Sequence, residues 1–229
     1  MFRAATARRA LVALVAVALL TPLTPAHAVD HSAGASSIDS LQMPGARMRK
    51  INPISQKAIA ALNFIQRTEN INDPLYLAAR KVVSDAVAAK MSIDAVALDK
   101  AWSRAPRDHQ IAVLAALTQL DVRYLEGKES PHVYMDCSGL LWYAWRTAGV
   151  DMPRQALSQL DRHMRVERED AIAGDISGEG THVQMYLGVG NAMVHAPFNR
   201  KTVRLKMMSE EQALRVIWTN PSLIATYRL

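Results

Sequence analysis

The spacing of apolar residues changes near residue 174, and this change constrains the fold more than any other feature of the sequence. Before it, apolar residues recur at the three- and four-residue intervals of helices that face a core. After it, short alternating segments separated by Gly, Asn and Pro are typical of strands, which we expect at 182–189, 192–196, 202–206 and 223–229. Helices followed by an antiparallel meander predict an α+β domain.

Helical signals occupy most of residues 51–150. Asp73 followed by Pro74 is a typical helix start, because the carboxylate caps free N–H groups and proline fits the first turn. Gly149 is a suitable stop for a helix that carries Cys137. We expect earlier helices over 52–68, over 72–90, from Ser92 to before Pro106, and from 107 to near 120.

The N-terminus resembles a secretory signal. Basic residues at Arg3, Arg8 and Arg9 precede an apolar run over 10–20, and Ala26-His27-Ala28 has the small-x-small pattern of a cleavage site. A retained membrane anchor is the alternative, although the apolar run is short for a bilayer span. The expected organisation is a signal peptide over 1–28, a flexible linker over 29–50, a helical region over 51–105 and a second domain over 106–229. We therefore expect a secreted, periplasmic or cell-wall-associated protein without stable membrane insertion after cleavage.

Charge excludes one class of partner. The whole chain has a formal net charge of +6, and the three arginines of residues 1–28 leave +3 (6 − 3) after cleavage. So small and scattered a charge does not predict nucleic-acid binding. The helical region 51–105 has no chemical motif, so a cap over a cleft, a partner surface and a scaffold all remain open for it. No particular protein partner or oligomeric state is predicted.

The chain has a single cysteine, Cys137, which excludes a disulfide within the chain. A leftover cysteine in an exported protein indicates a reactive thiol or an intermolecular bond, and a small buried core residue is the other interpretation. Cys137 follows Asp136, a suitable helix cap, and so lies in the first turn of its helix. Unpaired N–H groups there lower the pKa of a thiol and could hold an oxyanion. We therefore expect a reactive thiol.

A nucleophilic thiol needs a base, and two histidines are placed to supply one. His182 and His195 lie in neighbouring expected strands. A hairpin loop of two or four residues is expected to put their rings directly opposite on one face, whereas three residues would separate them. One cysteine and two histidines without a nearby carboxylate make a poor zinc site, so no metal or cofactor is expected. The other histidines, which are weaker candidates for this base, are His31, His109, His132 and His163.

These motifs together resemble one known family. The segment "DCSGLLWYAWRTAGVDMPR", then "GD", "HVQMYLG" and "MVHAP", is similar to the NlpC/P60 family of papain-like cysteine peptidases, whose members cut the peptides of bacterial cell walls. The resemblance covers about residues 107–229, including "LIATYRL", which looks like the last strand of the family. It implies helices packed on an antiparallel sheet.

The resemblance also implies roles for individual residues. Cys137 would be the nucleophile, His182 the general base, and His195 the group that orients His182. The bond cut would be an amide of the peptidoglycan stem peptide, between D-γ-glutamate and the diamino acid, through an acyl-thioester. The substrate would be bound by Tyr124, Asp136 and Ser138. For Asp136, a helix cap is an equally good interpretation.

Three features depart from the family pattern. Glu126 and Gly127 replace two glycines, Gln184 replaces a small residue that follows the histidine, and 174–182 is a short connection where relatives have a hydrophobic strand. Gln184 should share the face of His182 and could crowd the cleft. These departures keep two alternatives open: a non-catalytic peptidoglycan-binding or regulatory module, and a papain-like amidase or acyltransferase.

Overall fold

The computed structural model describes residues 51–198 and 201–224. The expected signal peptide and linker lie outside these residues. The helices are α1 (Pro53–Arg67), α2 (Pro74–Met91), α3 (Ala95–Arg104), α4 (Arg107–Leu117), α5 (Cys137–Thr147), α6 (Ala156–Gln159) and α7 (Glu210–Arg215), with short 3-10 helices η1 (Arg162–Met164), η2 (Arg168–Asp170) and η3 (Pro221–Leu223). The strands are β1 (Arg123–Tyr124), β2 (Glu129–Ser130), β3 (Tyr134–Met135), β4 (Arg165–Val166), β5 (Ile176–Glu179), β6 (His182–Tyr186), β7 (Ala192–His195), β8 (Arg204–Met207) and β9 (Ile217–Thr219).

The expected helix starts are confirmed where a capping side chain is followed by proline. Asp73 accepts hydrogen bonds from the backbone N–H groups of Leu75 and Tyr76, with Pro74 in the first turn of α2. The expected start of the third helix at Ser92 is wrong. Ser92 ends α2 in a left-handed conformation with φ 56°, and Asp94 caps α3 instead. The Asp94 carboxylate accepts from the N–H groups of Val96 and Ala97, so the helix begins at Ala95.

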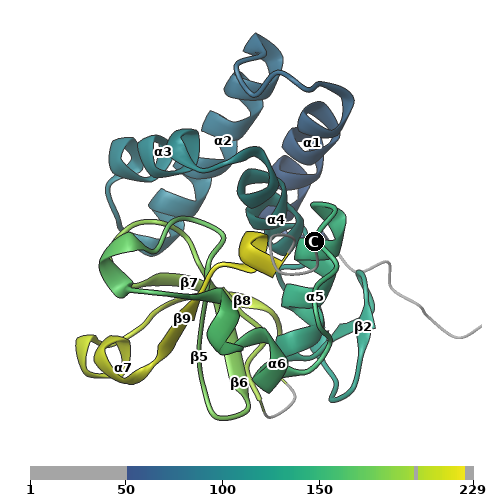
Figure 1. Cartoon of the computed structure of the whole chain (residues 1–229). Coiled ribbons are helices and arrows are strands. Elements are labelled where there is room, and N and C mark those ends of the chain that lie inside the picture. Colours follow the sequence, from purple (N-terminus) through teal and green to yellow (C-terminus); the bar gives the residue numbers. More distant parts are fainter. Residues whose placement is uncertain (1–50, 199–200, 225–229) are drawn as a thin grey trace, which may run out of the picture. The chain divides into compact units, whose positions relative to one another are not determined.

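The strands form a six-stranded sheet in the order β4-β9-β5-β6-β7-β8, in which every pairing is antiparallel (Figure 1). The expected α+β class is therefore confirmed. A three-stranded sheet, β1-β3-β2, leads into α5. Its β1 also contacts the segment just before the edge strand β8, since Tyr124 N–H donates to the Lys201 carbonyl.

Two expectations about strands are wrong. The segment 174–182 is more than a connection: it contains β5, which pairs with β6 across the turn at Gly180 and Thr181. Small and polar residues in β5 hide the strand pattern, because its Ser177 and Gly178 lie buried between neighbours. The segment 223–229 is not a strand at its start, since Leu223 belongs to η3, and 225–229 lie outside the described residues. Among the described residues, the last strand is β9.

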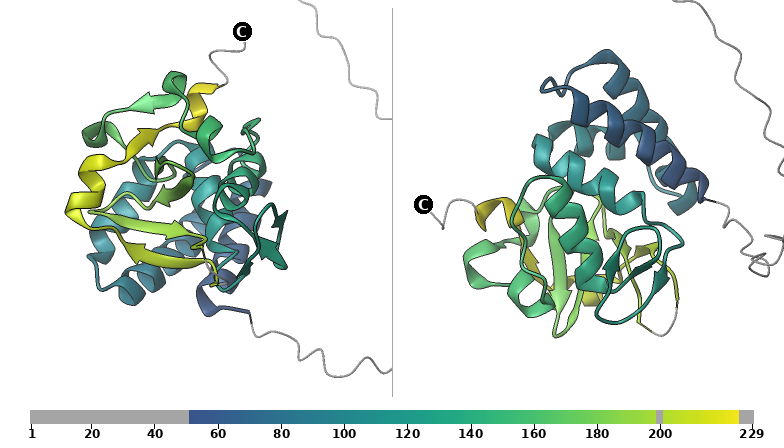
Figure 2. Two further views of the ribbon diagram at one scale, coloured as in Figure 1. Left: turned by 90° about the horizontal axis from the view of Figure 1, so that it is seen from below. Right: turned by 90° about the vertical axis from the view of Figure 1, so that its right-hand side faces the viewer.

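The helical region and the sheet share one hydrophobic core. Helix α4 packs against both α1 and α5, and α5 packs on β6, so α4 lies between the N-terminal helices and the cysteine-bearing helix (Figures 1 and 2). Trp102 of α3 donates its Nε1–H to the Leu187 carbonyl beyond β6 at 2.8 Å. The expected division at residues 105 and 106 stays a prediction. No helix within the described ranges is long and apolar enough to cross a bilayer.

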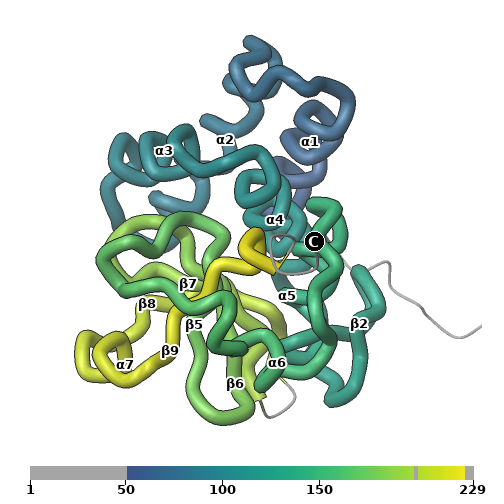
Figure 3. Tube along the Cα trace, in the orientation of Figure 1, coloured from purple at the N-terminus to yellow at the C-terminus, as the bar shows by residue number. Residues whose placement is uncertain are grey.

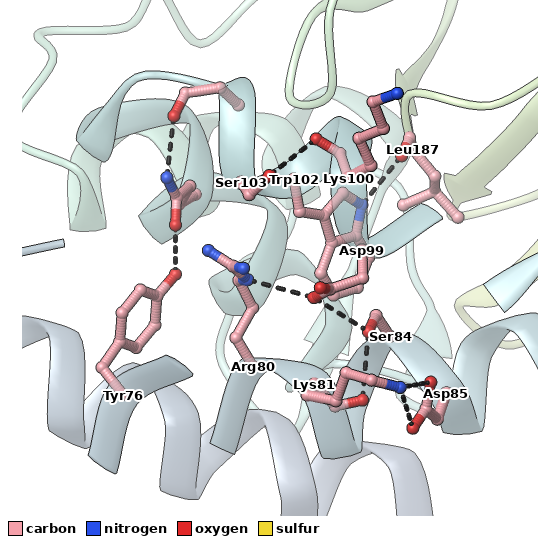
Figure 4. A network of polar contacts seen from close by, with 12 residues as sticks. Tyr76, Arg80, Lys81, Ser84, Asp85, Asp99, Lys100, Trp102, Ser103 and Leu187 are labelled. Atoms are coloured by element: carbon pink, nitrogen blue, oxygen red, sulfur yellow. Dashed lines mark hydrogen bonds and ion pairs between the residues drawn. The ribbon is translucent and has the colours of Figure 1, made fainter. Parts of the chain in front are cut away.

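Polar contacts hold α2 and α3 together (Figure 4). The buried Arg80 side chain bonds Asp99 at 3.3 Å, and the Tyr76 hydroxyl donates to the Gln110 amide oxygen at 2.5 Å. Burial raises the pKa of Tyr76, so this hydroxyl keeps its proton. The Arg80 contact joins α2 to α3, and the Tyr76 contact joins α2 to α4.

A buried Asp–His–Asp cluster joins α4 to the sheet. His109 is fully buried, and its ring nitrogens lie 3.0 Å from Asp108 and 3.1 Å from Asp175. Ser222 of η3 donates a hydrogen bond to Asp108, which brings the end of the described chain back to α4 (Figure 3). Burial opposes a charge on His109, but the two carboxylates outweigh it and raise the pKa of His109 to about 9. His109 is thus a structural imidazolium.

This cluster predicts a loss of stability at alkaline pH. Because the folded-state pKa of His109 lies above the ordinary 6.5, its stabilisation is complete below pH 6.5 and is lost as pH rises through about 9. The loss is on the order of 3 kcal/mol. Urea unfolding at pH 6 and pH 9 measures it. In His109→Gln the difference should shrink, and an equal pH dependence in both proteins would contradict the assignment.

Candidate active site

Cys137 is positioned by a capped helix start. The Asp136 carboxylate accepts from Gly139 N–H at 2.6 Å and from Gly127 N–H at 2.7 Å, and so fixes the first turn of α5. The expected cap is confirmed. Cys137 lies in that first turn and is only 6 % exposed. The turn is also close-packed, because a Cβ on Gly139 would lie 2.4 Å from the Lys128 carbonyl oxygen.

An open cleft of about 800 Å³ contains Cys137. Polar and charged groups form much of its lining, while Leu157 and Phe198 add apolar surface. All three expected substrate-binding residues, Tyr124, Asp136 and Ser138, line this cleft together with the cysteine. The remaining lining residues are Glu126, Gly127, Glu129, Arg154, Gln155, Ala156, Ser158 and Thr181.

Arg154 organises one wall of the cleft. Its guanidinium donates to Asp136 at 2.7 Å, to Ser138 at 2.8 Å and to Glu129 at 2.9 Å. Two of the expected substrate-binding side chains are thereby held by one cation. Arg154 was not among the expected site residues, although the Pro-Arg pair that contains it was part of the family pattern.

Tyr124 stands at the cleft as a neutral hydroxyl. Its ring packs against Phe198 with centroids 5.4 Å apart. Burial and the nearby Cys137, Asp136 and Glu126 raise the pKa of Tyr124 to about 12. The hydroxyl therefore keeps its proton in the neutral range and can donate a hydrogen bond to a developing oxyanion.

The sulfur lies against the backbone on both sides of His182. The Cys137 thiol donates a hydrogen bond to the Thr181 carbonyl at 3.6 Å, and the Val183 N–H donates one to the sulfur. Within residues 51–198 and 201–224, no hydrogen bond joins this thiol to the His182 ring. The ring instead bonds His195, with Nε2 to Nδ1 at 3.2 Å. The structure thus sets the thiol against the backbone at the start of β6 and pairs His182 with His195.

The two histidines share a face, but not in the expected geometry. Met185 of β6 pairs with Val194 of β7. Because the strands are antiparallel, the residue before Met185 lies opposite the residue after Val194, which places Gln184 opposite His195. His182 is therefore the diagonal neighbour of His195, and the expectation of directly opposed rings is wrong. The β6–β7 turn is centred one residue later in the chain than the midpoint between His182 and His195. The rings still meet edge to face, at an interplanar angle of 78° with centroids 5.5 Å apart.

Gln184 does not crowd the cleft. It shares the face of His182 but is 1 % exposed, and its amide nitrogen donates to Met208 Sδ at 3.0 Å. Met208 belongs to the smaller hydrophobic cluster, which also contains Met193 and Trp218. The histidines with weaker claims are also apart from the cleft lining, since His132 and His163 are exposed and His109 is in the buried cluster. His31 lies outside the described residues.

Burial reverses the expected pKa shift of the thiol. Removal from water raises the pKa of Cys137, and the N–H groups of Val183, Ser138 and Cys137 offset only part of the shift. Burial also lowers the pKa of His182, with a further contribution from Lys206. The free protein therefore contains a neutral thiol and a neutral imidazole rather than an ion pair.

This electrostatic state predicts a pH dependence for thiol reactivity. Since burial raises the pKa of Cys137 above the ordinary value of a thiol, the thiolate fraction should grow about tenfold per pH unit throughout the neutral range. Alkylation by iodoacetamide, followed by mass spectrometry from pH 6 to pH 9, should accelerate without a plateau. A plateau beginning below pH 7 would instead indicate a preformed thiolate–imidazolium pair.

Comparisons with known proteins agree with the family resemblance. The model of the NlpC/P60 family matches residues 121–220. The bifunctional muramidase/DL-endopeptidase CwlT of Bacillus subtilis is 35 % identical over 75 residues, which cover 29 % of this chain and 23 % of that protein. The murein DD-endopeptidase MepH of Escherichia coli is 26 % identical over 140 residues, covering 56 % and 51 %. The chain spans about half or less of the length of these curated relatives.

A solved structure, NlpC1 from Trichomonas vaginalis, matches with a TM-score of 0.41 and 27 % identity, covering 49 % of this chain and 45 % of that one.

Proposed function

The chain carries an NlpC/P60 domain over residues 121–220, and from this premise we propose that the protein is a cysteine endopeptidase that hydrolyses an amide bond in peptidoglycan stem peptides. The observation that carries the proposal is the thiol of Cys137 in the first turn of α5, in an open cleft of about 800 Å³. A thiol buried only for packing has no need of an open cleft.

The proposed reaction begins when Cys137 transfers its proton to His182 and attacks the carbonyl carbon of the scissile amide. The carbonyl oxygen becomes an oxyanion, which backbone N–H groups at the start of α5 and the Tyr124 hydroxyl stabilise. His182 then gives the proton to the leaving amine, and the C–N bond breaks. Water, deprotonated by His182, hydrolyses the acyl-thioester and restores the thiol. His195 orients the His182 ring throughout.

The cleft wall that Arg154 organises through its hydrogen bonds is proposed to bind the substrate. Asp136, Ser138 and Glu129 offer hydrogen-bond acceptors that Arg154 holds in place. Such acceptors suit an ammonium group or peptide N–H groups of the stem peptide. Glu126 adds a further carboxylate to the lining. Preorganised polar groups of this kind bind a substrate without the cost of ordering them.

We propose the bond between D-γ-glutamate and the diamino acid as the target. The printed name of CwlT, a DL-endopeptidase, supports it, whereas that of MepH names a DD-endopeptidase. Mass spectrometry of products from defined muropeptides separates these bonds. Uncross-linked tripeptide and tetrapeptide stems should lose the diamino acid end and leave a dipeptide. Cleavage confined to cross-linked muropeptides would contradict the DL assignment.

A second candidate function is peptidoglycan binding without cleavage. The observation that favours it is the neutral, buried thiol, which makes no hydrogen bond with His182 in the part of the chain that the structure describes. Binding to purified sacculi with no released muropeptide at any pH would support this candidate and remove the peptidase.

The proposed substrate lies outside the cytoplasmic membrane, so the proposal includes export. Cleavage of the signal peptide after Ala28 would leave a chain that starts at Val29. The intact mass of the exported protein tests this cleavage, and a mass that retains residues 1–28 would instead favour a membrane anchor.

A further inference from the structure

A chain of hydrogen bonds runs from the edge strand β8 to the histidine pair. Arg204 Nε–H donates to His195 Nε2 at 3.4 Å, and His195 Nδ1 lies 3.2 Å from His182 Nε2. The three side chains come from β8, β7 and β6, which are neighbours in the sheet. The direction of this chain decides which nitrogen of His182 carries its proton.

At the arginine end of this series of hydrogen bonds, only one direction of donation is possible. A guanidinium has donors and no acceptor, so His195 Nε2 must accept from Arg204 with its lone pair. Burial, followed by the charges of His182, Lys206, Arg204 and Lys201, lowers the pKa of His195 to about 3, so this ring is neutral. A neutral imidazole with an accepting Nε2 carries its proton on Nδ1. His195 therefore donates from Nδ1 to His182 Nε2.

The same logic fixes the second ring. His182 Nε2 accepts from His195, and burial and Lys206 lower the pKa of His182, so it too is neutral. Its proton must then be on Nδ1. An Nδ1–H group cannot accept the proton of a thiol. The partner of the Cys137 thiol agrees with this tautomer, because among the described residues the thiol donates to the Thr181 carbonyl and forms no hydrogen bond with the imidazole.

We propose that Arg204 is a positioning residue that fixes the proton order of the histidine pair, so that the resting protein holds His182 in the tautomer that cannot accept the proton of Cys137. This inference rests on the proposed roles of Cys137 and His182. When the Arg204 contact is broken, His195 can carry its proton on Nε2 and accept at Nδ1. His182 can then carry its proton on Nε2 and present the Nδ1 lone pair to the thiol, with no net gain or loss of protons.

Arg204→Met removes the donor, and Lys201→Met is its matched control. Both substitutions delete one positive charge that acts on His195, but Lys201 makes no hydrogen bond with that ring among the described contacts. Both side chains are exposed, so thermal unfolding of the full chain should match the unsubstituted protein. Nitrogen-15 NMR of the imidazoles reads the tautomers, and the rate of iodoacetamide alkylation at pH 7 reads the thiol.

In the unsubstituted protein His182 should carry its proton on Nδ1. In Arg204→Met it should shift to the Nε2–H tautomer, and alkylation of Cys137 should accelerate by about tenfold, since one net hydrogen bond of this strength is worth about that factor. Lys201→Met should keep the original tautomer, with less than about a twofold change in rate. The pH profile of alkylation in Arg204→Met should move to lower pH.

Three results would overturn the inference: an Nε2–H tautomer of His182 in the unsubstituted protein, an unchanged tautomer in Arg204→Met, or equal effects of the two substitutions. The last result would show that charge alone acts on the pair. These readouts need no substrate, so they stand if the protein cleaves no stem peptide. Conversely, muropeptide cleavage with an Nε2–H His182 at rest would leave the proposed function intact and remove only the role of Arg204.

Discussion

Cys137→Ala should lower the rate of muropeptide cleavage by at least about 10⁴-fold, because the remaining groups of the cleft can bind the peptide but cannot form the acyl-thioester. The variant should fold normally. The side chain is buried, but alanine removes only one sulfur atom, and the capping contacts of Asp136 stay in place. The measurement is product release from purified sacculi, followed by chromatography and mass spectrometry, with unfolding by urea as the check on the fold.

The control for this experiment is a substitution far from the thiol. Leu214 of α7 is 77 % exposed and is not among the residues that line the cleft, so Leu214→Ala should cleave at the unsubstituted rate. Undiminished cleavage by Cys137→Ala would remove the thiol mechanism. If the unsubstituted protein also releases nothing while binding sacculi, the binding candidate replaces the peptidase.

The second large effect is expected in stability. Trp102→Ala should lower the free energy of unfolding by about 4 kcal/mol, because the ring is 2 % exposed and its removal leaves a large cavity between α3 and the sheet. The substitution also deprives the Leu187 carbonyl of its donor (Figure 4). Urea unfolding of the full chain measures the change.

Val96 lies on the same helix and is 74 % exposed, so Val96→Ala is the matched control, with an expected change under about 0.5 kcal/mol. A loss of less than about 1 kcal/mol in Trp102→Ala would show that α3 contributes little to the shared core. The expected loss would show instead that the N-terminal helices and the sheet are stabilised as one unit.

The helices were predictable because their signals are local. Asp73, Pro74 and the periodic apolar residues of α2 act within one or two turns, so they can be recognised without knowing the rest of the fold. The cap at Asp136 was predictable for the same reason. The strand β5 was not, because buried Ser177 and Gly178 lack the alternation that marks a strand with one exposed face.

The candidate site residues could be named from the sequence, but their relative placement could not. Residue types and order pointed to Cys137, His182 and His195, and the structure brings the two rings into contact and the thiol against the start of β6. The diagonal placement of the rings depends on where the β6–β7 turn is centred. A shift of one residue in a turn leaves almost no trace in composition or periodicity.

The sequence by itself determined the α+β class, the capped start of α5 and the position of the only cysteine in its first turn, since each depends on neighbours along the chain. The tertiary structure decided the electrostatics. Burial raises the pKa of Cys137 although the helix start opposes it, and carboxylates from α4 and the segment before β5 raise the pKa of the buried His109. Desolvation and pairing depend on groups distant in sequence, which meet only when the chain folds.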